Sequence, residues 1–433
     1  MRKYLAATIT ICIFGFSCGE KRYSEALTPE EALTRFKLSD DFNIEIFAAE
    51  PFVMDPVELT FDESGNAYVV EMPDYPVRPP GGVGTGRIKI ISDTDGDGRI
   101  DSATIFADSI LEVSSVLNWN GGLIVAAAPN IFYLKDTNSD GRADTKQLLF
   151  TGFFHNNPEY QVNNLRFAVD NWIYAANFGQ AGTITSGTAS DTSSLSVERG
   201  DFRFQMDNGK FEVAAGRAQF GHALDTWGNR FTSENSIHIA QPAIPWRYTS
   251  RHPWLPPFDP VVSISDHEEL MYQETEAPYW RKERTKQRNE VFREQKVNRT
   301  EYADDHFTGA CGTTIYAGDL FPGEFYGNIF TNDVAGSLVH RDIISYDNDS
   351  IIFDATRGEK EKASEFLSST DPWFRPVNLT AGPDGALYVV DMYRQHVEGP
   401  DFIPEDLKKD MGFLNGKEYG RIYRITPKNK PSR

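Results

Sequence analysis

Short apolar runs separated by turn residues recur along most of the chain. In each copy a Gly- or Asn-containing turn is followed by a short β-rich run that ends on a polar residue, such as AYVVE at 67–71. These runs have the length and composition of buried strands, and the turns supply the left-handed backbone positions of hairpins. No helical period persists outside residues 19–38 and an insertion at 240–305. The pattern predicts an all-β protein.

The unit of turn and strand is an internal repeat. Residues 373–395 (WFRPVNLTAGPDGALYVVDMYRQ) match residues 53–75 (VMDPVELTFDESGNAYVVEMPDY) at an offset of 320 positions. Six copies are found, with turns at Gly65, Gly121, Asn171, Gly228, Gly327 and Gly385. Successive turns lie 56, 50, 57, 99 and 58 residues apart, and the long gap holds the insertion. About fifty residues suit one four-stranded blade, so we expect a six-bladed β-propeller over residues 39–427.

Two single strands flank the six copies. Residues 42–51 (FNIEIFAAEP) precede the first copy, and residues 420–427 (GRIYRITP) follow the last one, ahead of a short tail at 428–433. Unpaired strand edges promote aggregation. We therefore expect the N- and C-terminal strands to pair within one blade and to close the ring.

The insertion contains the main basic stretch of the chain, YWRKERTKQRNEVFREQK at 279–296. Such a stretch is typical of a solvated helix or loop. The alternatives are a cap over the mouth of the propeller channel and a docking face for an acidic partner.

The N-terminus has the pattern of a targeting segment. Two basic residues precede an apolar run that is too short for a stable membrane span, and residues 15–18 (GFSC) resemble a bacterial lipobox. We expect residues 1–18 to be a signal peptide, with lipidation of Cys18, or else simple cleavage of the signal. Residues 19–38 are polar and predict a tether. The mature protein is then periplasmic or at the cell surface, and Cys311 is expected to be a small buried thiol.

The charge balance bears on possible partners. The formal net charge is −20, with 40% hydrophobic and 13% aromatic residues. This charge argues against a nucleic-acid partner, because phosphate binding needs a positive surface field.

Two acidic loops in adjacent repeats predict calcium sites. The loops DTDGDGRID (93–101) and DTNSDGRAD (136–144) place oxygen side chains at alternate positions of a tight turn. This spacing suits a hard cation, although neither loop has the Glu that would complete an EF-hand. The predicted ligands are Asp93, Asp95, Asp97 and Asp101 in the first loop and Asp136, Asn138, Asp140 and Asp144 in the second.

The repeat also predicts a functional centre. Equivalent positions in a propeller meet at one channel mouth, so we expect the polar residues at the ends of the repeated runs to converge there: Glu71, Asn177, Glu234, Asp333 and Asp391. The segments that enter the repeats add Asp55, residues 160–163, residues 217–222 and Arg375. Such a polar mouth can bind a sugar, an anionic cofactor or a cation.

Five segments carry a resemblance to a known family: AAEPFVMDPVELTFDESGNAYVVEM, FGHALDTWGNRF, ACGTTIYAGDLFP, EFLSSTDPWFRPVNLTAGPDGALYVVDMYRQ and YGRIYRI. Over roughly residues 38–427 the chain resembles the membrane-bound dehydrogenase family, a propeller similar to the sugar dehydrogenases that use pyrroloquinoline quinone (PQQ). The resemblance implies a six-bladed propeller of the glucose and sorbosone dehydrogenase type, with quinoprotein chemistry.

The chain departs from that family in two respects. Members are often fused to a c-type cytochrome, but no Cys-x-x-Cys-His sequence is present, so electrons would pass to a separate acceptor such as a cytochrome c. Quinoprotein sugar dehydrogenases tend to carry a His base in the segment that here reads EYQVN (159–163). His155 lies just upstream.

The resemblance implies that the protein is an exported dehydrogenase that oxidises a sugar or polyol alcohol with PQQ in the channel. Its expected base is His155, with Glu71 or Asp391 as substitutes. The expected cofactor ligands are Asn163, Arg217, Arg375 and Arg394, and His306 is a further mouth residue. Two other functions remain open: a non-catalytic propeller that binds glycans or proteins, and a calcium-dependent lactonase with Glu71, Asn177 and Asp391 around a channel metal.

Overall fold

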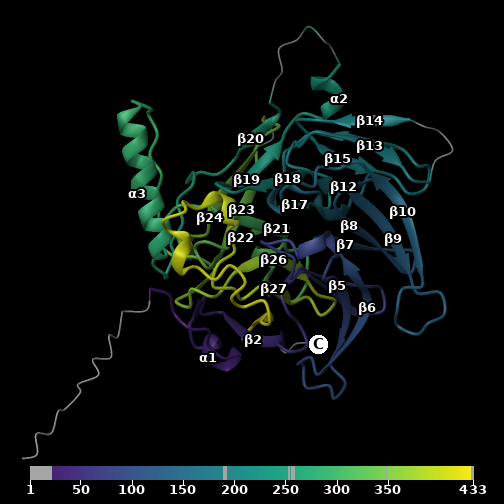
Figure 1. Cartoon of the computed structure of the whole chain (residues 1–433), viewed down its shortest axis with the longest axis horizontal. Helices are drawn as coiled ribbons and strands as arrows, with labels where there is room; N and C mark the ends of the chain where they lie inside the picture. The colour runs from purple at the N-terminus through teal and green to yellow at the C-terminus, as the bar shows by residue number, and fades with distance from the viewer. Residues whose placement is uncertain (1–21, 189–192, 252–253, 255–258, 348, 431–433) are drawn as a thin grey trace, which may run out of the picture.

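Six antiparallel sheets surround a common axis in the computed structural model (Figure 1). The structure describes residues 22–188, 193–251, 254, 259–347 and 349–430. Innermost strands of successive blades lie side by side around the ring, and the last blade contacts the first. The predicted six-bladed β-propeller is therefore confirmed.

Blades one to three follow one another along the chain. Blade one contains β3 (Pro56–Phe61), β4 (Ala67–Glu71), β5 (Gly86–Ser92) and β6 (Ser102–Ile110). Blade two contains β7 (Val113–Trp119), β8 (Gly122–Ala127), β9 (Asn130–Lys135) and β10 (Thr145–Thr151), extended at its outer edge by β13 (Gly182–Ser186) and β14 (Ser194–Val197). Blade three contains β11 (Asn163–Phe167), β12 (Ile173–Ala176), β15 (Asp201–Phe204) and β16 (Phe211–Ala214).

Blades four to six complete the ring. Blade four contains β17 (Gly221–Leu224), β18 (Arg230–Glu234), β19 (Ile237–Pro242) and β20 (Val261–Ser263). Blade five contains β21 (Ala310–Ile315), β22 (Ile329–Asp333), β23 (Leu338–Tyr346), β24 (Phe353–Arg357), β25 (Leu367–Ser369) and β1 (Phe36–Leu38). Blade six contains β26 (Pro376–Ala381), β27 (Leu387–Asp391), β28 (Arg421–Pro427) and β2 (Phe42–Ala49).

Helices are few. They are α1 (Pro29–Leu33), α2 (Trp246–Thr249) and α3 (Tyr279–Glu294), with 3-10 turns at Pro80–Gly82, Pro158–Tyr160 (η2), Gly323–Phe325, Glu359–Glu361, Pro400–Phe402 and Lys408–Asp410. In the described part of the chain, none of the helices has both the length and the apolar character needed to cross a bilayer.

All six predicted turns join the first strand of a blade to the second. Each turn residue has the positive φ that such hairpins require, from 63° at Asn171 to 88° at Gly228. The hairpin at Gly65 shows how the sequence specifies the turn, because the Asp62 side chain accepts hydrogen bonds from Ser64 N (2.9 Å) and Asn66 N (2.8 Å). Local turn chemistry thus sets the six-fold repeat.

The two strands that flank the repeats pair with each other and close the ring, as predicted. Strand β2 pairs antiparallel with β28, from Phe42 opposite Pro427 to Ala49 opposite Arg421. Apolar packing supports this closure: the Phe42 ring lies 4.6 Å from that of Phe321 and 5.3 Å from that of Phe366, both of blade five. One blade therefore joins the two ends of the propeller.

The segment predicted to be a tether is instead docked on the propeller where the structure describes it. Strand β1 pairs with β25, and α1 begins with a capping box between Thr28 and Glu31. The Tyr393 hydroxyl donates to Leu27 O (3.2 Å) and accepts from Leu27 N (2.8 Å). The expected signal peptide, including Cys18, lies outside the described residues.

Candidate functional site

A cavity of about 720 Å³ lies at one mouth of the central channel. Most of the innermost strands begin at its wall, where they contribute Val57 (β3), Ser114 (β7), Asn163 and Asn164 (β11), Cys311 (β21), and Val377 and Asn378 (β26). A volume of this size can hold a small ligand together with a cofactor. Equivalent chain positions therefore converge on one site, as a propeller requires.

Helix α3 of the insertion forms a second wall of this cavity. Its lining residues are Trp280, Arg281, Arg284, Thr285 and Arg288, spaced three and four apart so that they share one helix face. Trp280 is fully buried in a cluster with Ile403 and Leu407, which holds the helix against the segment after β27. Among the interpretations of the basic stretch, the structure favours the one in which it forms a cap that covers the channel mouth.

The arginines of α3 give this wall a positive charge. Arg288 pairs with Glu301 (3.3 Å), and Arg281 donates to the Thr308 hydroxyl. The Arg284 Nε has no hydrogen-bond partner among the described residues. Burial, together with the neighbouring charge of Arg288, lowers the pKa of Arg284 to about 10. An anion in the cavity would supply the missing partner.

Glu159 is the acid–base candidate of this site. It lies in η2, and Asn157 at the start of that turn accepts a hydrogen bond from Glu159 N (2.9 Å). Its Oε1 accepts from Gly399 N (3.1 Å) and lies 3.4 Å from the Tyr75 hydroxyl. Burial, reinforced by the charge of Glu398, raises the pKa of Glu159 to about 7. A carboxyl group with this pKa can give and take protons near neutral pH.

Some of the sequence-predicted mouth residues line the cavity. These are Tyr160, Asn163, Phe220 and His306, together with Cys311, which is a buried free thiol as predicted. The Asn163 amide nitrogen donates to Gln161 O (2.9 Å) and Gln219 O (2.7 Å). The His306 ring stacks on Tyr302, with centroids 3.8 Å apart. Aromatic and polar groups thus both line the cavity.

The expected base, His155, does not lie at the cavity. Its side chain is exposed and does not belong to the cavity wall, while its backbone carbonyl accepts hydrogen bonds from Arg78 and Gln161. Glu159, four residues further along, takes the position at the cavity that the sequence analysis assigned to a base.

Glu71 and Asp391 do not line the cavity, contrary to the prediction. The strands that follow the six turns, at whose ends they lie, are the second strands of the blades. Both carboxylates are fully buried and hold backbone groups. Glu71 accepts from Met54 N (2.8 Å), and Asp391 accepts from Arg375 N (2.8 Å). The equivalent Asp333 accepts from Thr308 N and Gly309 N (3.0 and 2.9 Å). These groups fix the loops that enter the innermost strands, and neither they nor Asn177 and Glu234 line the cavity.

The predicted cofactor arginines are also engaged elsewhere. Arg375 donates to the backbone carbonyls of Arg394, Val334 and Gln395, at 2.6 to 3.2 Å. Arg394 forms a buried two-bond pair with Asp55, at 2.5 and 2.8 Å. Arg217 pairs with Asp259 (2.9 Å) near the surface. The guanidinium groups at the cavity come instead from α3, which the sequence marked only as a basic stretch, and from Arg299 after it.

The two acidic loops join the third and fourth strands of blades one and two. In the first loop the Asp93 carboxylate accepts from Gly96 N and Gly98 N (2.7 Å each), and an equivalent network surrounds Asp136 in the second. Carboxylate oxygens of Asp93, Asp95 and Asp97 lie within 4.8 Å of one another. Because successive strands of a blade alternate in direction, both loops lie on the face opposite the cavity. A cation there would be structural.

Calcium is expected to raise the melting temperature of the protein by roughly 5 °C at a calcium concentration well above its dissociation constant. Thermal unfolding in calcium and in EDTA measures this shift. Replacing both Asp95 and Asp97 with Asn should reduce it, whereas Asp40→Asn with Asp401→Asn, at exposed positions outside the loops, should not. Equal melting temperatures in the two buffers would refute calcium binding.

Comparison with curated protein sequences finds no match. Among solved structures, the chain is similar to an oxidoreductase (glucose dehydrogenase) from Thermus thermophilus, with 14% identity over 89% of this chain and 99% of that chain and a TM-score of 0.46. The PQQ domain of pyranose dehydrogenase from Coprinopsis cinerea gives 11% identity, coverage of 90% and 97%, and a TM-score of 0.44. The soluble aldose sugar dehydrogenase from Escherichia coli gives 12% identity, coverage of 89% of this chain and 100% of that chain, and a TM-score of 0.44.

At these identities no activity is carried over from those structures to this chain. The match to a family model is more extensive, since it covers residues 28–429 and so nearly all of the propeller. The chain belongs to the family of that model, the domain of unknown function DUF7133.

Proposed function

We propose that the mouth cavity is the active site of a dehydrogenase that oxidises an alcohol group of a small carbohydrate or polyol. The observation that carries the proposal is Glu159, a carboxyl group in the cavity wall whose pKa burial raises to about 7. Alcohol oxidation requires a base that removes the hydroxyl proton, and a base works best when its pKa is near the working pH. Glu159 meets this requirement, and the Tyr75 hydroxyl, which donates to Val397 O, lies beside it.

An anionic quinone cofactor of the PQQ class suits the donor set of the cavity. PQQ is a planar polycarboxylate, and Arg281, Arg284 and Arg288 present guanidinium groups along one wall. Guanidinium groups match carboxylates in shape and charge. Tyr160 and Phe402, whose ring centroids lie 6.4 Å apart, offer aromatic surface beside them. When bound, such a cofactor supplies a two-electron acceptor for the alcohol carbon.

The residues of the chain have separate roles in this scheme. The arginines of α3 bind the cofactor carboxylates, and Glu159 takes the hydroxyl proton of the substrate. Helix α3 and the packed segment after β27 exclude water, which strengthens the charge interactions inside. Electrons leave to a separate acceptor such as a cytochrome c.

The N-terminal pattern supports an exported location for this activity. A basic start, a short apolar run and Cys18 in GFSC are typical of a lipoprotein signal. We infer a periplasmic or cell-surface protein that a lipid on Cys18 anchors to the membrane. Such a location would give the enzyme access to external sugars.

The test is reconstitution of the purified protein with PQQ and calcium. A panel of aldoses and polyols is supplied with an artificial electron acceptor dye, and dye reduction is followed by absorbance. PQQ binding is measured separately by titration calorimetry. Arg284→Gln should weaken PQQ binding by about 10- to 100-fold, because a buried charge-assisted hydrogen bond is lost.

The matched control is Arg293→Gln, an exposed arginine on the same helix, which should leave PQQ binding unchanged. Sugar binding without dye reduction by the PQQ-loaded protein would overturn the dehydrogenase proposal in favour of a binding propeller. Absence of PQQ binding would overturn the assignment of the cofactor.

A further inference from the structure

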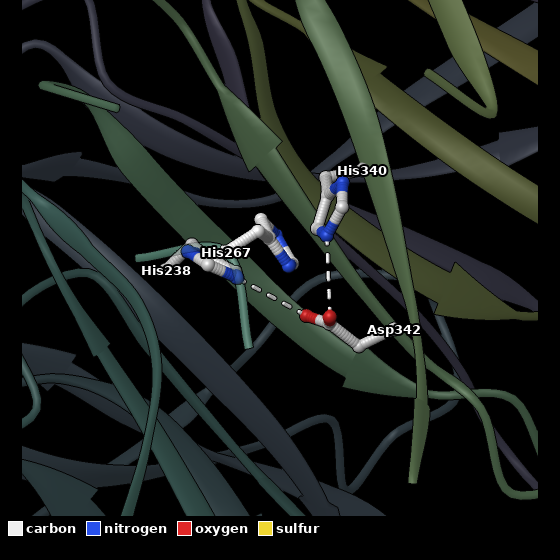
Figure 2. Close-up of side chains that lie close together, drawn as sticks. All are labelled: His238, His267, His340 and Asp342. Atoms are coloured by element: carbon white, nitrogen blue, oxygen red, sulfur yellow. Dashed lines mark ion pairs between the residues drawn. The ribbon is translucent and has the colours of Figure 1, made fainter. Parts of the chain in front are cut away.

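Three histidines and one aspartate meet at the seam between blades four and five, next to Phe307 of the cavity wall. His238 lies on β19, His267 follows β20, and His340 and Asp342 lie two residues apart on the same face of β23. Figure 2 shows the three imidazole rings turned toward the Asp342 carboxylate from different sides. None of the four residues lines the cavity.

Two of the distances between the donor atoms agree with those in a tetrahedral metal site. The Nε2 atoms of His238 and His340 lie 3.3 Å from the two carboxylate oxygens of Asp342. One ligand atom from each of the four residues lies within 4.8 Å of all the others. A tetrahedral ion with ligand bonds of about 2.0–2.1 Å holds its donors about 3.3–3.4 Å apart. The side chains are thus arranged as ligands around a common centre.

The inward-facing atoms lack other partners. Within the described chain, the Nε2 atoms of the three histidines and both oxygens of Asp342 have no hydrogen bond. His238, His340 and Asp342 are each 1% exposed or less. A buried polar group without a hydrogen-bond partner is destabilising, so five such atoms at one point call for a common partner. A cation bound to one atom of each residue satisfies four of them at once.

The outward-facing nitrogens have the contacts expected of metal-binding histidines. His340 Nδ1 lies 2.7 Å from Glu365 Oε2, and His267 Nδ1 lies 2.7 Å from Asp266 Oδ1. Glu365 is itself held by Arg357 (3.0 Å) and by Tyr272 N (2.8 Å). An Nδ1–H that donates to a carboxylate fixes the ring and directs the Nε2 lone pair to the metal.

Apolar residues cover one side of the cluster. The Phe307 ring stacks on His238, with centroids 4.3 Å apart, and lies edge-on to His340 at 5.5 Å. Phe307 packs in turn with Met271, Ala310 and Leu338. Such a shell strengthens the binding of a charged ion and limits exchange with water. Three imidazoles and one carboxylate favour a transition metal over calcium or magnesium, which prefer all-oxygen sites.

We propose that His238, His267, His340 and Asp342 bind one zinc ion. The ion joins the third strands of two adjacent blades to the part of the insertion between β20 and α3. The chain after β20 already adds to blade five, where Ala355 N donates to Ile264 O (2.9 Å) and Asp266 N donates to Ala355 O (3.1 Å). The zinc fixes the base of the cap at this point. Its role is structural, and it exists whether or not the cavity has dehydrogenase activity.

The test is metal analysis of the full-length protein purified from zinc-supplemented medium. Elemental analysis should find about one zinc per chain, and His238→Ala and His340→Ala should lose it. His155→Gln, which changes an exposed histidine, should retain it. Cobalt added to the metal-stripped protein should give the visible absorption bands of a tetrahedral site, and these bands should be absent from His267→Ala, whose side chain lies at the edge of the cluster and whose loss perturbs folding least.

A second readout is thermal unfolding. A strong zinc chelator should lower the melting temperature of the unmodified protein and leave that of His340→Ala unchanged. The proposal is overturned if the folded protein neither retains zinc nor gives the cobalt spectrum, or if the histidine variants bind the metal as well as the unmodified chain does.

Discussion

Replacing Glu159 with Gln should lower kcat for alcohol oxidation by about 10²- to 10⁴-fold, the usual contribution of a general base. Gln keeps the size of the side chain, and its carbonyl oxygen can still accept the hydrogen bond from Gly399 N. The change therefore removes proton transfer but not the packing of the wall. KM should change little, since the substrate is still held by the rest of the cavity. Steady-state kinetics with the substrate that reduces the dye separates the two constants.

The pH profile gives an independent check on the same residue. Only ionised Glu159 can take a proton, and its pKa is about 7, so kcat/KM should rise with pH through 7 and then level off. Glu159→Gln should lose this acidic limb. Glu290→Gln, an exposed carboxylate on α3, should retain both the rate and the limb. An unchanged profile in Glu159→Gln would rule Glu159 out as the base.

Arg394→Gln should lower the free energy of unfolding by about 3–5 kcal/mol, because it leaves the Asp55 carboxylate buried without its counter-charge. Asp55 precedes the first strand of blade one, whereas Arg394 follows the second strand of blade six, and both side chains are 1% exposed or less. Arg394 also donates to the backbone carbonyls of Phe413 and Tyr75, each at 3.1 Å. The pair thus holds the seam where the ring closes. Denaturant unfolding measures the change.

A double variant separates the charge from the rest of the effect. Asp55 has a φ of 49°, which Asn also tolerates, so Asp55→Asn removes the charge with little backbone strain. We expect Arg394→Gln combined with Asp55→Asn to be more stable than Arg394→Gln alone. Lys360→Gln, which breaks the exposed pair with Asp41, should have almost no effect. If the double variant were no more stable than the single one, the buried charge would not explain the loss.

The fold could be predicted from the sequence because its information is local. Each hairpin carries its own turn residue, and the match between residues 53–75 and 373–395 shows that the unit repeats. Closure by β2 and β28 followed from the two strands left over at the ends. The docking of residues 22–38 was missed, because it depends on contacts with blades five and six that a short polar segment does not reveal.

The cavity was located only in part. Asn163 and His306 were expected at the mouth because they precede innermost strands, and they do line it. Glu71 and Asp391 were misplaced because a polar residue at a strand end can either face a channel or cap backbone N–H groups, and the sequence does not distinguish the two. The position of α3 depends on the packing of Trp280 against residues that lie far along the chain. The arginines of α3 could therefore not be assigned to the cavity from the sequence.

The histidine cluster shows the same limit more strongly. His238, His267 and His340 are separated by 29 and 73 residues, which matches no short metal-binding motif. The only local signal was the pair His340 and Asp342, which alternation places on one face of a strand. Their convergence results from the neighbouring positions of blades four and five in the ring.

The pairing of β2 with β28 has a consequence for the order of events during synthesis. Glu45 and Arg424, which bond across this pair, are 379 residues apart. A ribosome therefore completes β2 long before its partner strand exists, and the first strand waits with an open hydrogen-bonding edge through almost the whole of translation. The last step of folding must therefore follow synthesis of β28, and a polypeptide that stops short of residue 421 carries two unmatched edges, each able to recruit another molecule into an aggregate.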